Sequence, residues 1–176
     1  MSSKVNRGKD FENKIREAFE RVPECSVDRL HDQMSGYAGS SNICDFIVYR
    51  KPYQLYLECK ACYGNTLNFH NITDNQWKGL LKKSEIDGVI AGVVIWFIEH
   101  DTTVFIPIQS LESHRQAGAK SVSAKTGYSD YGMNWILLPG EKKRVFFEYE
   151  AGLFLDYLKW LEDFDMCELG EEDQYE

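Results

Sequence analysis

The sequence of 176 residues lacks the long apolar run that a membrane-spanning helix requires. Its longest apolar stretch, Val89 to Ile98, has about half of the roughly 20 residues needed to cross a bilayer. The first residues also lack the apolar segment of a signal peptide. We therefore expect a cytoplasmic protein with no membrane partner.

Cysteine is scarce as well, with five residues that are scattered and odd in number. This pattern predicts no disulfide framework and fits a reducing compartment. One pair, Cys59-x-x-Cys62, leaves open a zinc site completed by Cys44 or His70, or a redox pair. No second C-x-x-C motif accompanies it, and no internal repeat is present.

The sequence also lacks an excess of basic residues. It has 20 Lys and Arg and 28 Asp and Glu, for a net charge of -8. The imbalance lies at one end. Residues 144–176 contain 2 basic and 11 acidic side chains, whereas residues 1–143 contain 18 and 17. The body of the chain is thus nearly neutral and can present a basic face, so net charge does not exclude a nucleic-acid partner.

The apolar periodicity predicts one α/β (α+β) domain with a mixed central sheet flanked by helices. Val89 to Glu99 is a near-continuous apolar run typical of a buried central strand. Thr73 and Gln76 form a capping-box pattern at the start of a helix that runs to about Glu85. Further helices are expected at about Asp10–Val22, Gln109–Gln116 and Glu150–Leu161, strands at Ser26–Leu30, Thr103–Ile108, Trp135–Leu138 and Val145–Tyr149, and loops at 31–43 and 117–133. In the last helix the expected apolar stripe is Leu153, Leu155, Leu158 and Trp160.

The segment from Cys44 to Lys60 reads as a β-hairpin, because two apolar runs flank a polar break that contains Pro52. A turn centred between Lys51 and Pro52 places Asp45 opposite Glu58. Like charges at facing positions destabilise a sheet, but two carboxylates suit a hard cation such as Mg²⁺. Strand alternation puts Lys60 on the same face as Glu58 and buries Cys59 on the other.

Asp45 followed by Glu58-Cys59-Lys60 resembles the D-x(n)-E-x-K pattern of the PD-(D/E)XK nucleases. The resemblance implies that Asp45, Glu58 and the Cys59 carbonyl bind Mg²⁺ (or Mn²⁺). Lys60 would orient the attacking water and stabilise the transition state. Cys44 stands where the name motif has proline.

Flanking features over residues 5–108 are similar to RecU-type Holliday-junction resolvases. These features are Asn6-Arg7-Gly8 before a helix with Glu12, the Asp45 to Glu58 spacing, and a helix-borne Gln76. The resemblance implies a homodimer that cleaves four-way DNA junctions, in a bacterial or phage-infected host cell.

The same resemblance assigns further residues. Glu12 and Gln76 would support the catalytic site, and Arg7 would contact DNA. Lys9 and the glycine-rich loop are expected to reach phosphate, and Tyr37 to stack on bases. Residues 23–43 are shorter than the stalk of the family. We expect one nuclease domain over residues 1–162, with a disordered start at 1–6, a mobile loop or short stalk at 31–43, and an acidic tail at 163–176.

Other interpretations stay open at this point. Asp45, Glu58 and Lys60 can be a solvated surface ion pair, and Gln76 a helix cap alone. The substrate can instead be linear duplex DNA, as for a restriction or repair enzyme. The fold can also be a non-catalytic DNA-binding module.

Overall fold

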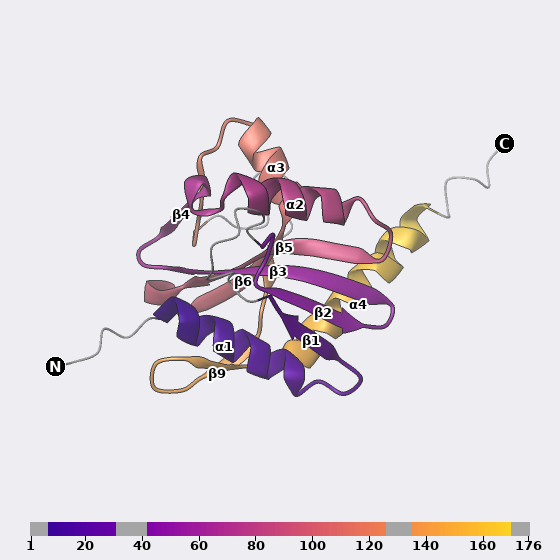
Figure 1. The fold of residues 1–176 in the computed structure, drawn as a ribbon, viewed down its shortest axis with the longest axis horizontal. Coiled ribbons are helices and arrows are strands. Elements are labelled where there is room, and N and C mark those ends of the chain that lie inside the picture. The colour runs from indigo at the N-terminus through magenta and orange to yellow at the C-terminus, as the bar shows by residue number, and fades with distance from the viewer. Residues whose placement is uncertain (1–6, 31–41, 126–134, 170–176) are drawn as a thin grey trace, which may run out of the picture.

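A computed structural model of the chain describes residues 7–30, 42–125 and 135–169, with side chains as far as Leu161. Its centre is a six-stranded sheet in the order β1-β2-β3-β5-β6-β8 (Figure 1). The strands are β1 (Ser26–Arg29), β2 (Phe46–Arg50), β3 (Tyr53–Cys62), β5 (Val89–Phe97), β6 (Thr102–Pro107) and β8 (Ile136–Leu137). The pair β3 and β5 is parallel and the other neighbours are antiparallel, so the predicted mixed sheet is confirmed.

The hairpin of β2 and β3 has the predicted register. Phe46 pairs with Leu57, and the two strands are joined through Lys51 and Pro52 alone. Continuing the register by one residue sets Asp45 beside Glu58. The regular ladder ends at Phe46, and the Asp45 N–H donates to the Leu57 carbonyl across 3.0 Å, one residue off that register, so Asp45 lies beside Glu58 and not directly opposite it.

Helices cover both faces of the sheet, and each face has its own apolar core (Figure 1). On one side α1 (Arg7–Glu20) and α4 (Ala151–Leu169) pack on residues such as Leu55, Leu57 and Cys59. On the other side α2 (Asp74–Ser84) and α3 (Ile108–Gln116) pack on residues such as Val93 and Ile95. The sheet is therefore buried on both faces, as the continuous apolar run of β5 predicted.

Small elements complete the chain. They are β4 (Thr66–Asn68) paired with β7 (Ser121–Ser123), β9 (Gly140–Lys142) paired with β10 (Phe147–Tyr149), and the 3₁₀ turns Phe69–Asn71 and Ile98–His100. The strands β7 and β9 are absent from the sequence prediction, whereas β10 lies within the predicted strand Val145–Tyr149. None of the helices in the described ranges is long and apolar enough to cross a membrane.

The last helix departs from expectation in two ways. It continues to Leu169, past the predicted end at Leu161. Leu153 and Trp160 were expected in its buried stripe but are 60% and 54% exposed, so that prediction is wrong. Positions 153 and 155 lie on nearly opposite sides of a helix, and the core takes Leu155 and Leu158, together with Phe154. The expectations for residues 1–6 and 31–41 lie outside the described residues.

Candidate active site

Two carboxylates meet where β2 and β3 begin to separate. Backbone hydrogen bonds fix the Asp45 backbone on both sides, to Leu30 in one direction and to Leu57 in the other. The Asp45 Oδ2 atom then accepts a 2.7 Å hydrogen bond from the Cys59 N–H. This contact orients the Asp45 carboxylate toward the backbone beside Glu58.

Glu58 is held by two donors on one of its oxygens. Lys60 Nζ lies 2.7 Å from Glu58 Oε1, and Gln76 Nε2 donates to the same oxygen across 2.7 Å. The Glu58 side chain is only 3% exposed, whereas that of Lys60 is 22% exposed. The second oxygen, Oε2, is buried and has no hydrogen-bond partner within the described ranges. A buried carboxylate oxygen without a partner is costly and marks a place for a ligand.

The electrostatics of Glu58 follow from this burial. Loss of solvent raises the pKa of the carboxyl to about 7, the Asp45 charge adds to the rise, and the Lys60 ammonium opposes it. Two acids that repel each other in a buried site are the arrangement that a bound cation relieves.

Gln76 has two roles at once. Its Oε1 accepts from the Thr73 N–H, and the Thr73 hydroxyl accepts from the Gln76 N–H, which completes the predicted capping box of α2. Its Nε2 is left for Glu58. The same side chain therefore starts the helix and reaches the carboxylate.

Glu12 lies on α1 and forms a 2.9 Å salt bridge with Arg29 of β1, and each of the two side chains is 25% exposed. Its charge is close enough to raise the pKa of Glu58 slightly. Sequence analysis did not single out Arg29, because nothing local links a strand arginine to a helix acid 17 residues earlier.

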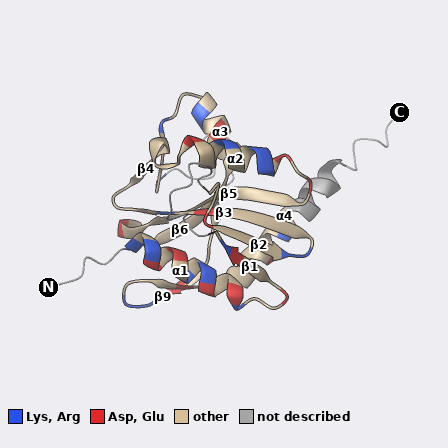
Figure 2. Cartoon of the chain, in the orientation of Figure 1, with Lys and Arg blue, Asp and Glu red and all other residues tan. Residues whose placement is uncertain are grey.

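The residues expected to contact DNA are less clustered. Arg7 begins α1, with its guanidinium 5.3 Å from the centre of the exposed Tyr63 ring, and the exposed Lys9 follows two residues later. Basic and acidic residues alternate along this helix (Figure 2). Tyr37 lies outside the described residues.

The cysteine pair does not form a zinc or redox site. Cys59 belongs to the core under α1 and Cys62 to the core under α2, so their side chains lie on opposite faces of the sheet. Within the described ranges, no three His, Cys, Asp or Glu side chains are grouped to hold a metal. Burial raises the pKa of Cys44 to about 12 and holds the pKa of Cys59 well above its usual value, which makes both thiols unreactive.

The site nevertheless fits a hard divalent cation. Such a cation takes carboxylate and carbonyl oxygens and keeps several waters, so two acids and one backbone carbonyl suffice. Asp45, Glu58 with its unpartnered Oε2, and the Cys59 carbonyl offer this donor set. Glu12 stays on Arg29 and is not part of a three-acid group.

Comparison with known proteins identifies the family of the chain. The family described as RecU, Recombination protein U, matches residues 21–163. The chain therefore belongs to the RecU family of Holliday-junction resolvases. This confirms the expected PD-(D/E)XK-type fold and the expected nuclease class.

The solved structures to which the chain is similar include that of Archaeoglobus fulgidus Hjc, a Holliday junction resolvase from an archaeal hyperthermophile. The likeness has a TM-score of 0.44 and 18% identity, and covers 58% of this chain and 78% of that chain. No curated protein sequence matches the chain. The family match extends past the expected limit of residue 108 and begins after Arg7 and Glu12.

Proposed function

We propose that the protein is a Mg²⁺- or Mn²⁺-dependent endodeoxyribonuclease that hydrolyses phosphodiester bonds of four-way DNA junctions. Membership of the RecU family supports the junction as substrate. The observation that carries the metal dependence is the buried, unpartnered Glu58 Oε2 beside Asp45.

In this proposal Asp45, Glu58 and the Cys59 carbonyl hold the cation. When bound, the cation lowers the pKa of water and neutralises phosphate charge. Gln76 fixes the Glu58 carboxylate and leaves its Oε2 for ligation. Lys60, only partly exposed, has further N–H donors beyond the one used on Glu58 and directs them toward the attacking water or the transition-state oxygens. Glu12 pairs with Arg29 at the edge of the site, and this pair contributes to the electrostatics of the site.

DNA contacts are assigned to the start of α1. Arg7 and Lys9 lie at the helix end nearest to Tyr63, which directly follows β3. Their charges and the N-terminal end of the helix dipole both favour phosphate there. Tyr37 is proposed to stack on an unpaired base. A DNA-processing role of this kind places the protein in the cytoplasm of a bacterial or phage-infected cell.

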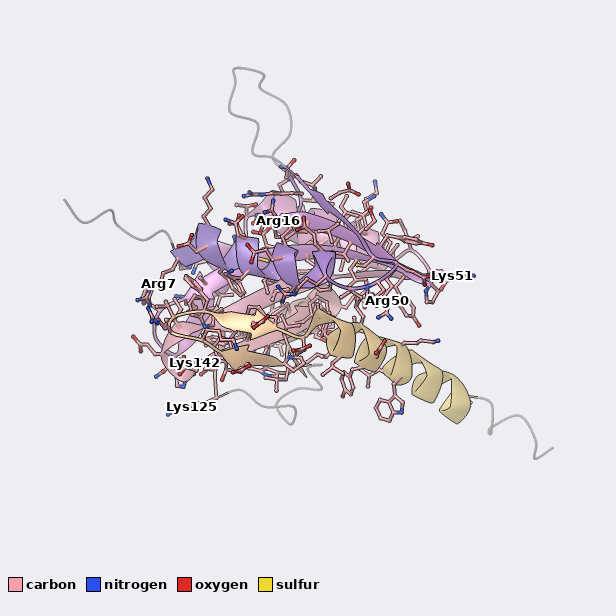
Figure 3. The ribbon with its side chains drawn as sticks, turned by 90° about the horizontal axis from the view of Figure 1, so that it is seen from below. Arg7, Arg16, Arg50, Lys51, Lys125 and Lys142 are labelled. Atoms are coloured by element: carbon pink, nitrogen blue, oxygen red, sulfur yellow. The ribbon has the colours of Figure 1, made fainter. Side chains whose placement is uncertain are left out.

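We assign a homodimer as the working unit, since one chain carries one pair of facing acids and a four-way junction offers two symmetric strands. Leu153, Tyr157 and Trp160 form an exposed stripe on α4, with spacings of four and three residues. This spacing suits packing against a second helix. Figure 3 shows α4 projecting from the body, where the same stripe of a second copy can meet it.

The test is cleavage of a four-way junction, a fork and a linear duplex with Mg²⁺ or Mn²⁺. We expect the junction to be cut first, and Asp45→Asn to abolish cleavage while junction binding persists. Normal cleavage by Asp45→Asn would disprove the mechanism. Preferred cutting of linear duplex would mean that linear duplex, and not the junction, is the substrate. Cutting of none of the three would indicate a non-catalytic DNA-binding module.

A further inference from the structure

The interior of helix α2 contains a glycine, Gly79, at a position where a side chain has no room. A Cβ at Gly79 would lie 2.4 Å from Ile43 Cγ2 and 2.7 Å from Ile43 Cβ. Both distances are shorter than real Cβ contacts, and Ile43 Cβ is fixed to the backbone. Glycine destabilises a helix interior compared with alanine, so its presence here needs a packing reason.

The helix face that carries Gly79 lies along the catalytic hairpin. Gln76, Gly79 and Lys83 are spaced by three and four residues and so share one face of α2. Gln76 contacts Glu58 across 2.7 Å, and Lys83 lies 5.0 Å from the centre of the Tyr56 ring. Gly79 sits between these two contacts, directly on Ile43.

Ile43 is two residues before Asp45, so the contact with Gly79 bears on both halves of the site. A second link joins the same elements, because the Asn75 side-chain amide donates to the Asn42 carbonyl across 3.4 Å. Helix α2 thus contacts the chain that leads into Asp45 and, one turn away, the carboxylate of Glu58. Helix α2 can approach both Ile43 and Glu58 this closely only if residue 79 has no side chain.

We propose that Gly79 is a positioning residue of the active site: its missing side chain lets α2 pack against Ile43 closely enough to hold Gln76 on Glu58 while Asp45 stays beside it. The consequence for the reaction rests on the proposed metal-dependent nuclease function. The geometric claim stands on the packing alone.

The experiment compares Gly79→Ala with Gly152→Ala. Gly152 is also helical, but a Cβ there has nothing within 4 Å, which makes it a matched control. Gly79→Ala should weaken Mn²⁺ binding without DNA by roughly 10–100-fold, and slow single-turnover junction cleavage by roughly 100-fold. Gly152→Ala should leave both values at wild type.

Changes at Ile43 separate positioning from a general folding defect. In the Gly79→Ala background, Ile43→Val keeps both obstructing atoms and should restore nothing. Ile43→Ala removes Cγ2 but keeps Cβ, so it should restore Mn²⁺ affinity in part. Ile43→Gly removes both atoms and should restore the most. The single Ile43 variants give the baseline for each double variant.

A crystal structure of Gly79→Ala decides the geometric claim independently of activity. The expected result is loss of the Gln76 Nε2 to Glu58 Oε1 hydrogen bond, with Ile43 displaced from α2. If that contact stays at hydrogen-bond distance and Mn²⁺ affinity equals that of Gly152→Ala, the proposal is overturned. If the wild-type protein cleaves no DNA, the proposed function fails, and the crystal structure still tests the role of Gly79.

Discussion

Gln76 joins the two halves of the site, because its amide nitrogen donates to Glu58 Oε1 across 2.7 Å while its amide oxygen accepts from the Thr73 N–H at the start of α2. The first turn of a helix is thereby bonded to a buried acid in the middle of a sheet. One oxygen of Glu58 is used by Gln76 and Lys60, and the other is buried without a hydrogen-bond partner among the described residues, as the proposed cation site requires.

The variant Gln76→Glu separates the two roles of this residue. Glutamate at this position keeps the capping box, so α2 should begin as before. It cannot donate to Glu58, and its charge repels that carboxylate. We expect cleavage and Mn²⁺ affinity to fall by roughly 10–100-fold, measured by single-turnover kinetics and metal titration. Wild-type rates in Gln76→Glu would show that Gln76 serves only as a cap.

Thr73→Ala is the complementary variant. It removes the hydroxyl that accepts from the Gln76 N–H and leaves the Gln76 side chain in place. Loss of such a cap costs about 1 kcal/mol of unfolding free energy. Denaturant unfolding should detect that loss while the cleavage rate stays at wild type. A fall in the cleavage rate comparable to that of Gln76→Glu would mean that the cap and the site cannot be separated.

Glu58→Gln should make the protein more stable in alkaline solution. Burial and Asp45 raise the pKa of Glu58 from 4.5 to about 7 in the folded state. Below about pH 4.5 both the folded and the unfolded chain hold the proton, so the shift costs nothing. Between about pH 4.5 and 7 the unfolded chain releases its proton first, and stability falls by about 3 kcal/mol in total, then stays level.

The glutamine variant has no such proton. Unfolding in urea with a chelator present measures the stability of Glu58→Gln relative to the wild-type protein. This relative stability should be greater at pH 8 than at pH 4.5 by about 3 kcal/mol. Mn²⁺ should then stabilise the wild-type protein at pH 8 and not Glu58→Gln, since a ligand stabilises only the state that binds it. A stability difference independent of pH would contradict the raised pKa of Glu58.

The parts of the site that the sequence predicted are those set by local rules. Strand alternation and a short turn determine the register of β2 and β3, so the closeness of Asp45 to Glu58 could be predicted from the spacing alone, although its offset from the directly facing position could not. The capping box likewise depends on two residues three positions apart, Thr73 and Gln76. The role of Gln76 toward Glu58 came only from the family resemblance.

The parts that escaped prediction depend on distant packing. Arg29 meets Glu12 because β1 forms the sheet edge beside α1, which no local pattern reveals. In α4 two apolar stripes overlap in the sequence, and only the packed core selects Phe154 and Leu158 over Trp160. From the sequence alone, Gly79 is only a residue that destabilises a helix, and its packing against Ile43 is visible only in the structure.

Arg7→Ala tests the DNA contact proposed at the start of α1. If Arg7 neutralises one phosphate, junction affinity should fall and the slope of log affinity against log salt should decrease by about 1. Lys51→Ala is the control, because Lys51 lies at the opposite end of the molecule (Figure 3). Equal effects of the two variants on the salt slope, measured by fluorescence anisotropy with a labelled junction, would remove Arg7 from the interface.

Trp160→Glu tests the proposed dimer. Trp160 is 54% exposed and its ring stacks on Tyr157, with ring centres 5.7 Å apart, so neither side chain supports the core of its own chain. A charge within the α4 stripe should therefore dissociate two copies without unfolding either one. Sedimentation should show a monomer at concentrations where the wild-type protein is a dimer, with an unchanged melting temperature for the monomeric fold.

The control is Lys159→Glu, which introduces the same carboxylate next to the stripe and not in it, and should leave the dimer intact. A Trp160→Glu protein that still sediments as a dimer would exclude the α4 stripe as the interface, because an unpaired carboxylate buried in such a contact costs several kcal/mol.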